Sequence, residues 1–151
     1  MARYITSTDQ NVSLNGTIPF DIVSIPCSKK DVVPLTSGVL TLRGRTSNCF
    51  ARYDVKVQGN IAIPEGGAVT PIAVGISING VVSPESVAIV TPAAVGDYWH
   101  IDTVIPVTVP SGCCVSVSAV YVDGTEDDAS TTPTPSILVR RQASITVTRT
   151  A

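Results

Sequence analysis

Apolar and polar residues alternate with a period of two along several runs of the chain. In one run, Tyr53, Val55 and Val57 alternate with polar or charged neighbours. The same alternation recurs at positions 72 to 78, 105 to 109, 115 to 121 and 145 to 147. Because successive side chains of a strand point to opposite faces, this pattern predicts half-buried β-strands.

Residues that favour turns separate these runs, at positions 64 to 67, 79 to 80, 110 to 112 and 123 to 124. Pro84, Pro92 and Gly96 interrupt the best candidate for a helix, so we expect no long helix. The pattern predicts an all-β chain of about eight to ten strands, at the spacing of an antiparallel sandwich or barrel.

The chain has room for about one domain. We expect residues 26–151 to form a single β-sandwich domain. The more polar residues 1–25 are expected to form edge strands or an arm that docks onto a neighbour and tethers the protein. The segment Thr125–Pro135, which contains acidic residues followed by Thr and Pro, predicts an exposed, mobile loop.

The two outer faces of the predicted strands differ in character. Arg52, Asp54 and Lys56 form a charged face that we assign to water. A second face is small and uncharged, which allows close backbone approach and favours a subunit contact. The residues expected at this contact are Tyr53, Ala73, Gly75 and Ser77. Packing of a second sheet of the same subunit on this face is the alternative.

Composition narrows the class of protein. Charged residues make up only 15% of the 151 residues and hydrophobic residues 44%. This profile is the opposite of a disordered chain and differs from that of a helical bundle. The formal net charge of −2 provides no positive field for nucleic acid. With so few charges to cover a monomer, part of the surface is expected to be buried against copies of the same chain.

Neither a membrane span nor an export signal is expected. The uncharged stretches Gly66–Pro84 and Thr103–Val122 are both interrupted by proline and glycine. The segment Met1–Asp9 lacks the continuous apolar core of a signal peptide. We therefore expect assembly in a reducing cytosol, with the four cysteines as free, packed thiols. A disulfide between Cys27 and Cys49 is the alternative.

The chain offers few groups for catalysis. Its one histidine is His100, and no Gly-x-Ser-x-Gly motif accompanies it. The cysteines lack zinc-ligand spacing, and the acidic residues between Asp123 and Asp128 lack the spacing of a calcium loop. We expect no enzyme activity, no cofactor and no metal site. A hydrolase that uses His100 is the weakest alternative.

Two aromatic residues, Tyr98 and Trp99, directly precede His100. Such pairs stack on sugars or bases, so these three residues are a candidate contact for a glycan or a protein partner. Anchoring of the core or of a subunit interface is the more ordinary interpretation of the same pair.

Three segments follow one another in a distinctive order. Phe50–Val57 contains aromatic residues, Ile72–Gly80 ends in an Asn-Gly turn, and Val107–Val117 holds two strands around a tight glycine turn. Over about residues 37 to 149, this order resembles the C1q/TNF-like jelly-roll superfamily. The resemblance implies a jelly roll that forms a homotrimer around an axis of apolar and small residues. The chain lacks the collagen-like stem of secreted members, which argues against a secreted signalling role.

The Met1–Tyr4 start, Ile61–Pro64, Ile89–Val95 and the turn Gly112–Cys114 are similar to small virion proteins of phages and prophages of gut bacteria. This resemblance implies a non-enzymatic virion protein, a trimeric capsid decoration or head-fibre module. It would be assembled in the host cytoplasm, released by lysis, and bound to the capsid or other virion proteins. The alternative function is a receptor- or glycan-binding module at a fibre or tail tip that contacts a host surface glycan.

Overall fold

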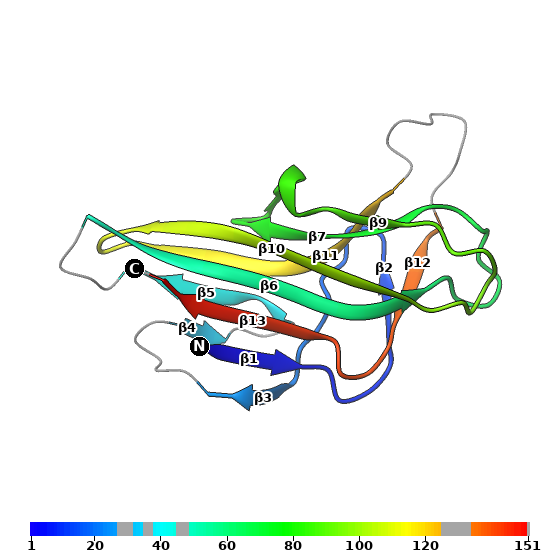
Figure 1. Cartoon of the computed structure of the whole chain (residues 1–151), viewed down its shortest axis with the longest axis horizontal. Coiled ribbons are helices and arrows are strands. Elements are labelled where there is room, and N and C mark those ends of the chain that lie inside the picture. The colour runs from blue at the N-terminus through cyan, green and yellow to red at the C-terminus, as the bar shows by residue number, and fades with distance from the viewer. Residues whose placement is uncertain (27–31, 35–37, 45–48, 125–133, 151) are drawn as a thin grey trace.

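The computed structural model describes residues 1–26, 32–34, 38–44, 49–124 and 134–150, which form two antiparallel β-sheets (Figure 1). Sheet A has the order β2 (Gln10–Ser13), β12 (Ser136–Val139), β6 (Phe50–Ala62), β13 (Ser144–Arg149), β1 (Ala2–Ile5) and β3 (Ile22–Ile25), with β10 (Trp99–Pro110) also paired to β6. Sheet B has the order β4 (Val32–Pro34), β5 (Leu40–Arg43), β11 (Cys114–Asp123), β7 (Ile72–Ile78) and β8 (Val81–Val82), with β9 (Ala88–Val90) also paired to β7. The predicted all-β antiparallel sandwich is confirmed.

Strand β6 is a central strand of sheet A, with other strands paired to both of its edges. It pairs with β10 from Phe50, opposite Pro110, to Ile61, opposite Trp99. Its other edge pairs first with β13 and then with β12. The alternation in this strand turns its branched apolar side chains to the core face of the sheet and its polar ones to the other face.

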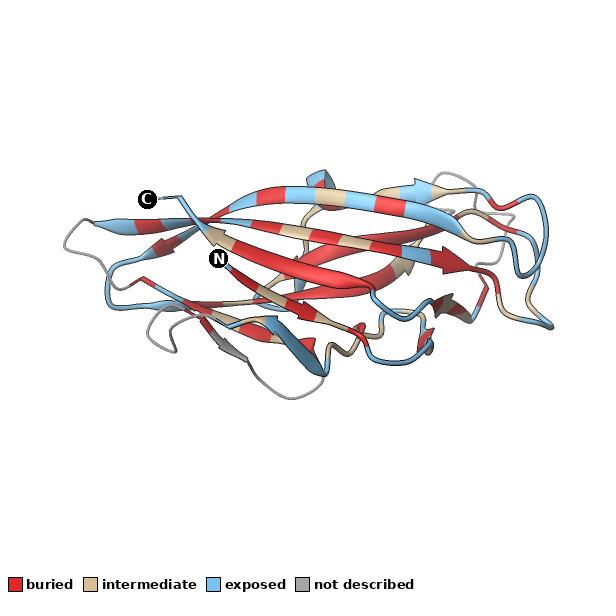
Figure 2. Cartoon of the chain, turned by 60° about the horizontal axis from the view of Figure 1, so that its bottom comes forward, coloured by how far each residue is buried: buried red, intermediate tan, exposed pale blue. Residues whose placement is uncertain are grey.

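The core lies between the two sheets. Figure 2 shows buried and less buried residues alternating along β6 and β10 of sheet A. The largest fully buried side chains include Tyr53 from sheet A and Tyr121 from sheet B. Both phenols have hydrogen-bond acceptors: Tyr53 Oη donates to the Arg43 carbonyl at 2.6 Å, and Tyr121 Oη donates to the Thr134 carbonyl at 2.7 Å. The core therefore tolerates these polar atoms without leaving them unpaired.

The turns predicted from composition serve two different purposes. Asn79 (φ 51°) and Gly80 (φ 84°) join β7 to β8 in a two-residue hairpin of the I′ kind, which requires positive φ at both positions. The turn after Pro110, closed by a hydrogen bond from Cys113 N to the Pro110 carbonyl at 3.1 Å, instead carries the chain from sheet A to sheet B. Strands β10 and β11 are thus adjacent in sequence but lie in opposite sheets.

Residues 1–25 contribute strands to the sandwich. Strand β1 lies between β13 and β3, and β2 closes the other edge of sheet A against β12. Ala2 is fully buried and Tyr4 nearly so. Of the two possibilities raised by the sequence, the structure has strands here, and the ladder to β13 ties the first residues to the last.

The described residues form 13 strands, more than the alternation alone predicted. The additional strands have two to four residues, too few to show a period of two. The segment considered for a helix holds only the 3₁₀ turn η2 (Pro84–Ser86) and β9. Within the described part of the chain, no helix is long and apolar enough to cross a membrane.

The buried phenol of Tyr121 predicts a loss of stability at high pH. Burial, and secondly the charge of Asp123, raises the pKa of Tyr121 to about 12 from its ordinary value of 10.0. The folded state therefore retains this proton after the unfolded state has released it. The free energy of unfolding should be independent of this group below pH 10 and should fall between pH 10 and 12.

Urea denaturation from pH 7 to pH 12 measures this effect, with Tyr121→Phe as the matched variant. At neutral pH the variant should lose about 1 kcal/mol, because the Thr134 carbonyl loses its donor. Above pH 10 its stability should fall less steeply than that of the wild type. Equal slopes in the two proteins would contradict the assignment to Tyr121.

Candidate functional site

The residues predicted for a subunit contact are buried within the protomer. Tyr53 is 1% exposed and points into the core between the sheets. Ala73 and Gly75 lie on the outer face of β7 and are also buried. The assignment of these three residues to a subunit contact is therefore corrected, because the chain itself already encloses them. Ser77, on the same outer face, is 5% exposed and lines a surface hollow described below.

The cover over Ala73 and Gly75 comes from the segment that follows β7. A Cβ atom on Gly75 would lie 2.8 Å from Val82 Cγ1 and 3.2 Å from Val87 Cγ2. The segment is held by Ser86, whose Oγ accepts a hydrogen bond from Ile76 N at 2.7 Å and donates to the Ser83 carbonyl, also at 2.7 Å. The alternative of packing within the subunit thus holds, with a short hairpin and a 3₁₀ turn in place of a second sheet.

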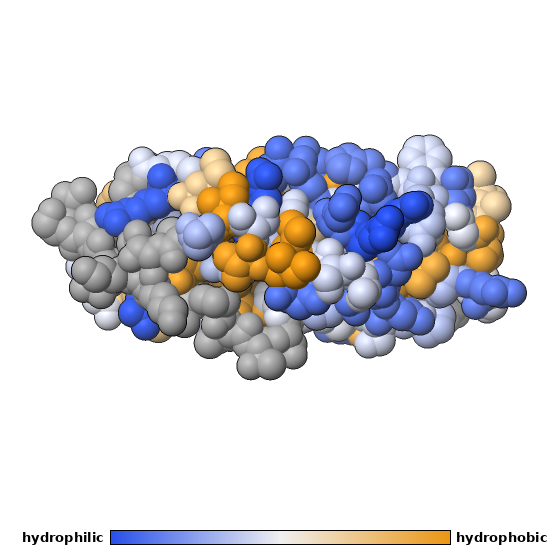
Figure 3. Space-filling view, turned by 90° about the horizontal axis from the view of Figure 1, so that it is seen from below, coloured by the Kyte–Doolittle hydropathy of each residue, from blue (hydrophilic) through white to orange (hydrophobic). Residues whose placement is uncertain are grey.

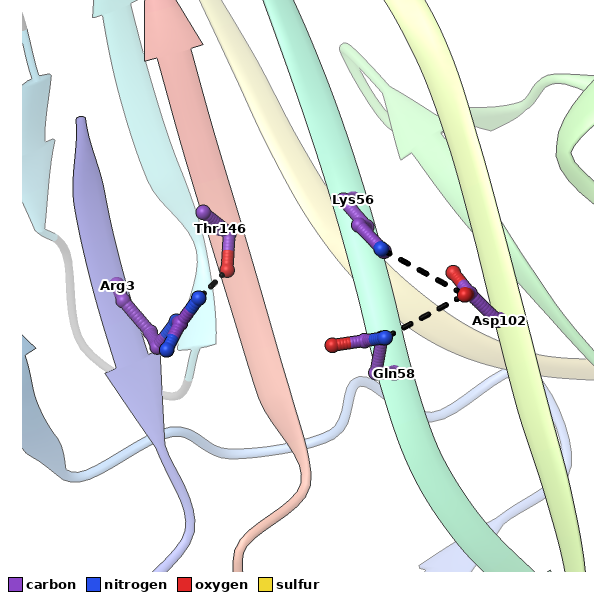
Figure 4. Close-up of polar contacts among 5 residues, drawn as sticks. All are labelled: Arg3, Lys56, Gln58, Asp102 and Thr146. Carbon is purple, nitrogen blue, oxygen red and sulfur yellow. Dashed lines mark hydrogen bonds and ion pairs between the residues drawn. The ribbon is translucent and has the colours of Figure 1, made fainter.

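The outer face of sheet A is polar and open to water, as the sequence predicted. Lys56 Nζ lies 3.6 Å from Asp102 Oδ2, and Gln58 Nε2 donates to the same oxygen at 3.3 Å (Figure 4). Arg3 Nε donates to Thr146 Oγ1 at 3.2 Å on the neighbouring pair of strands. Lys56 and Asp102 thus form an exposed ion pair, which contributes little to stability.

The aromatic pair lies at the start of β10. Trp99 is 46% exposed, with Nε1 donating to Asp97 Oδ2 at 3.1 Å, and His100 is exposed. The Arg140 guanidinium carbon lies 5.3 Å from the centre of the Tyr98 ring. Because Trp99 is exposed, it does not anchor the core of the protomer.

A hollow of about 430 Å³ begins at the same arginine. Its lining residues are Ser7, Thr8, Asp9, Arg140 and Arg141. Asp9 Oδ1 accepts a hydrogen bond from Arg141 N at 2.7 Å. The structure therefore places Tyr98, through Arg140, next to a polar depression that no sequence motif indicated, since its walls come from opposite ends of the chain.

The cysteines and acidic residues that the structure describes form no metal site. Cys49, Cys113 and Cys114 are free, as expected, but they are exposed and not packed. Cys27 and the acidic residues 126–128 lie outside the described residues, as does the predicted loop up to residue 133. Among the residues that the structure describes, no group of three or more potential ligands is close enough to hold a metal ion.

A second hollow, of about 500 Å³, lies on the outer face of sheet B. We call it the serine hollow. Its polar lining residues are Asn15, Thr17, Ser77, Ser116 and Ser118. Its remaining lining residues are Val39, Gly80, Val82 and Val120. The alternation of serine with apolar residues in β7 and β11 was visible in the sequence, but the pairing of these strands was not.

Apolar side chains gather near β3 at the edge of sheet A. Ile22 and Val23 are both exposed, one on each face of this edge strand. Viewed from below, the molecule shows a hydrophobic patch near its middle (Figure 3). We call Ile22, Val23 and the paired Ile5 the β3 patch.

No protein-family model matches the chain, and no curated protein matches it in sequence. Among solved structures, it is similar to the Eiger TNF of S. frugiperda, with a TM-score of 0.58 and 11% identity over 99% of this chain and 91% of that one. The chain has a TNF-like jelly-roll fold.

Two further structures match with lower TM-scores. One is the C-terminal domain of EclA, a sugar-binding protein, with a TM-score of 0.41 and 14% identity over 94% of this chain and 79% of that one. The other is the CBM22-1 xylan-binding domain of Paenibacillus barcinonensis Xyn10C, with a TM-score of 0.34 and 9% identity over 99% and 87% of the two chains.

Gly75→Ala tests whether the chain itself covers this face. The added methyl group would crowd Val82 and Val87, and overpacking of this kind costs about 1–3 kcal/mol. Urea denaturation should show this loss, whereas Ser77→Ala on the same strand face should show none. Unchanged stability in the Gly75 variant would mean that the segment after β7 does not pack here.

Proposed function

We propose that the chain is a non-enzymatic binding module that assembles as a homotrimer and decorates the capsid, or forms a head fibre, of a phage particle. The observation that carries the self-assembly is the β3 patch. Apolar side chains clustered on the surface of a small protein mark a contact surface. The TNF-like jelly-roll fold supports a binding role carried by surfaces.

The β3 patch favours a second copy of the chain as its partner. Strand β3 is the last strand of sheet A, and its residues Ile22–Ile25 carry no charge. An uncharged, apolar sheet edge is a template for pairing unless something covers it. Charged residues make up only 15% of the whole chain, which also favours burial of part of its surface. In a closed assembly, other copies of the chain would bury that surface.

The virion location rests on the sequence. The resemblance of Met1–Tyr4 and three further segments to small phage proteins supports assembly in the bacterial cytoplasm and exposure after lysis. Many weak contacts between a trimer and repeated capsid subunits would provide tight binding without a deep pocket. The net charge of −2 supports protein partners over nucleic acid.

Light scattering of the purified chain tests the trimer. The expected mass is three times 15.7 kDa, about 47 kDa. Val23→Glu, which places a charge in the β3 patch, should shift the mass toward 15.7 kDa while circular dichroism stays unchanged. Val81→Glu is the matched control, because Val81 is even more exposed but lies in sheet B. A monomeric wild-type chain would overturn the trimer.

Purified particles test the virion location. The chain should co-sediment with virions in a density gradient and should be detected there by mass spectrometry. Truncation of the predicted tether, residues 1–20, would not test its contact with the particle, because it would also remove the pairing of β1 with β13 and of β2 with β12. Recovery of the chain only in the soluble fraction of the lysate would overturn this location.

Glycan recognition at Tyr98, Trp99 and His100 is the second candidate function. The exposed indole of Trp99 favours it, as does the Tyr98 ring, which lies against Arg140 of the neighbouring hollow. Stacking of a ring on an aromatic side chain contributes about 1–3 kcal/mol. Trp99→Ala should therefore reduce binding on a glycan array and adsorption to host cells by about 5- to 150-fold. Equal adsorption of variant and wild type would contradict this function.

A further inference from the structure

The floor of the serine hollow is a row of four side chains across three paired strands. Ser118 of β11 lies directly opposite Ser77 of β7, and Ser77 lies opposite Val82 of β8. Val39 precedes β5 and lines the hollow on the far side of β11. The floor thus presents two neighbouring hydroxyl groups between two valines.

The two serines of the floor have little exposed surface, and their hydroxyl groups make no hydrogen bond with other described residues. Ser77 is 5% exposed and Ser118 is 7% exposed. Neither Oγ forms a hydrogen bond with another of the described residues, in contrast to Ser86 on the same side of the sheet, whose Oγ bonds to Ile76 and Ser83. Both serines line the hollow, so their hydroxyl groups are open to it and available to a ligand that enters.

The chemistry of the lining restricts what would pair with them. None of the described residues that line the hollow is charged. A charged ligand would lose its hydration without gaining a counter-charge, which is strongly unfavourable. Each serine hydroxyl group both donates and accepts, and this suits a ligand whose own groups do the same. The valine methyl groups beside the serines provide apolar contact for carbon-bound hydrogens.

We propose that the serine hollow binds a neutral saccharide unit, with its hydroxyl groups bonded to Ser77 and Ser118. The volume of about 500 Å³ lies within the usual range of small-ligand sites. Exposed Asn15 and Gly80 lie at the rim, so the hollow is open to solvent. This site is separate from Trp99, and it depends neither on the trimer nor on the virion location.

Titration of the full chain with defined sugars, followed by amide NMR spectra, tests the proposal. The neutral probes are the methyl glycosides of glucose, galactose and rhamnose, and N-acetylglucosamine. The charged probes, expected not to bind, are glucuronate and N-acetylneuraminate. At least one neutral probe should give saturable shifts at the amides of Ser77, Ser118 and Val120 at up to about 50 mM, the range for a few hydrogen bonds.

Ser77→Ala and Ser118→Ala should each weaken this binding about tenfold, as the loss of one buried hydrogen bond predicts. Without sugar, both variants should keep the melting temperature, because neither Oγ bonds to another of the described residues. Ser24→Ala, an exposed serine of β3, is the matched control and should leave binding unchanged. Trp99→Ala should also leave it unchanged, which separates this site from the aromatic one.

Four results would overturn the proposal. They are the absence of saturable shifts with every neutral probe, shifts confined to residues 98–100, equal binding of the charged probes, and unaltered affinity in both serine variants. A lowered melting temperature in Ser77→Ala or Ser118→Ala would show that the hydroxyl groups are structural, and would overturn it as well. None of these outcomes bears on the oligomeric mass, so the proposed function is tested separately.

Discussion

The double hydrogen-bond ladder of β6 is the interaction on which the rest of the structure depends. One edge of this strand pairs with β10, and the other pairs with β13 and then β12. Because both edges of the strand are paired along most of its length, its side chains point to one or the other face of the sheet. Tyr53, Val55 and Val57 fill the core, and their charged neighbours face water.

The same constraint has a different result in sheet B. The outer face of β7 is made of Ala73, Gly75 and Ser77, which are too small to protect the strand themselves. The hairpin to β8 and the turn η2 fold back over the first part of this face, where Gly75 leaves room for Val82. The segment after β7 packs over Gly75, whereas Ser77, further along the same face of β7, lines the serine hollow.

The termini also depend on pairing between distant segments. The first residues of the chain lie between β13 and β3, and the Thr6 carbonyl accepts a hydrogen bond from Gln142 N at 2.9 Å. Residues 1–25 are thus part of the fold, which limits any role as a detachable arm. What remains for contact with other molecules is the β3 patch, the aromatic end near Trp99 and the serine hollow.

The sequence by itself determined the strands that are long enough to show alternation, such as 53–57 and 72–78, and the turns where Asn79 and Gly80 need positive φ. These are local properties: a period of two and a backbone preference operate within a few residues. Only the tertiary structure decided which apolar or small face is enclosed by the chain itself. The sequence around Ala73 and Gly75 does not distinguish cover by another subunit from cover by a hairpin of the same chain. Ser77 lies opposite Ser118, 41 residues later in the chain, because of the register in which β7 and β11 pair. Pairing between distant strands is a property of the whole fold, because the period of two fixes a side chain's face but not its neighbour.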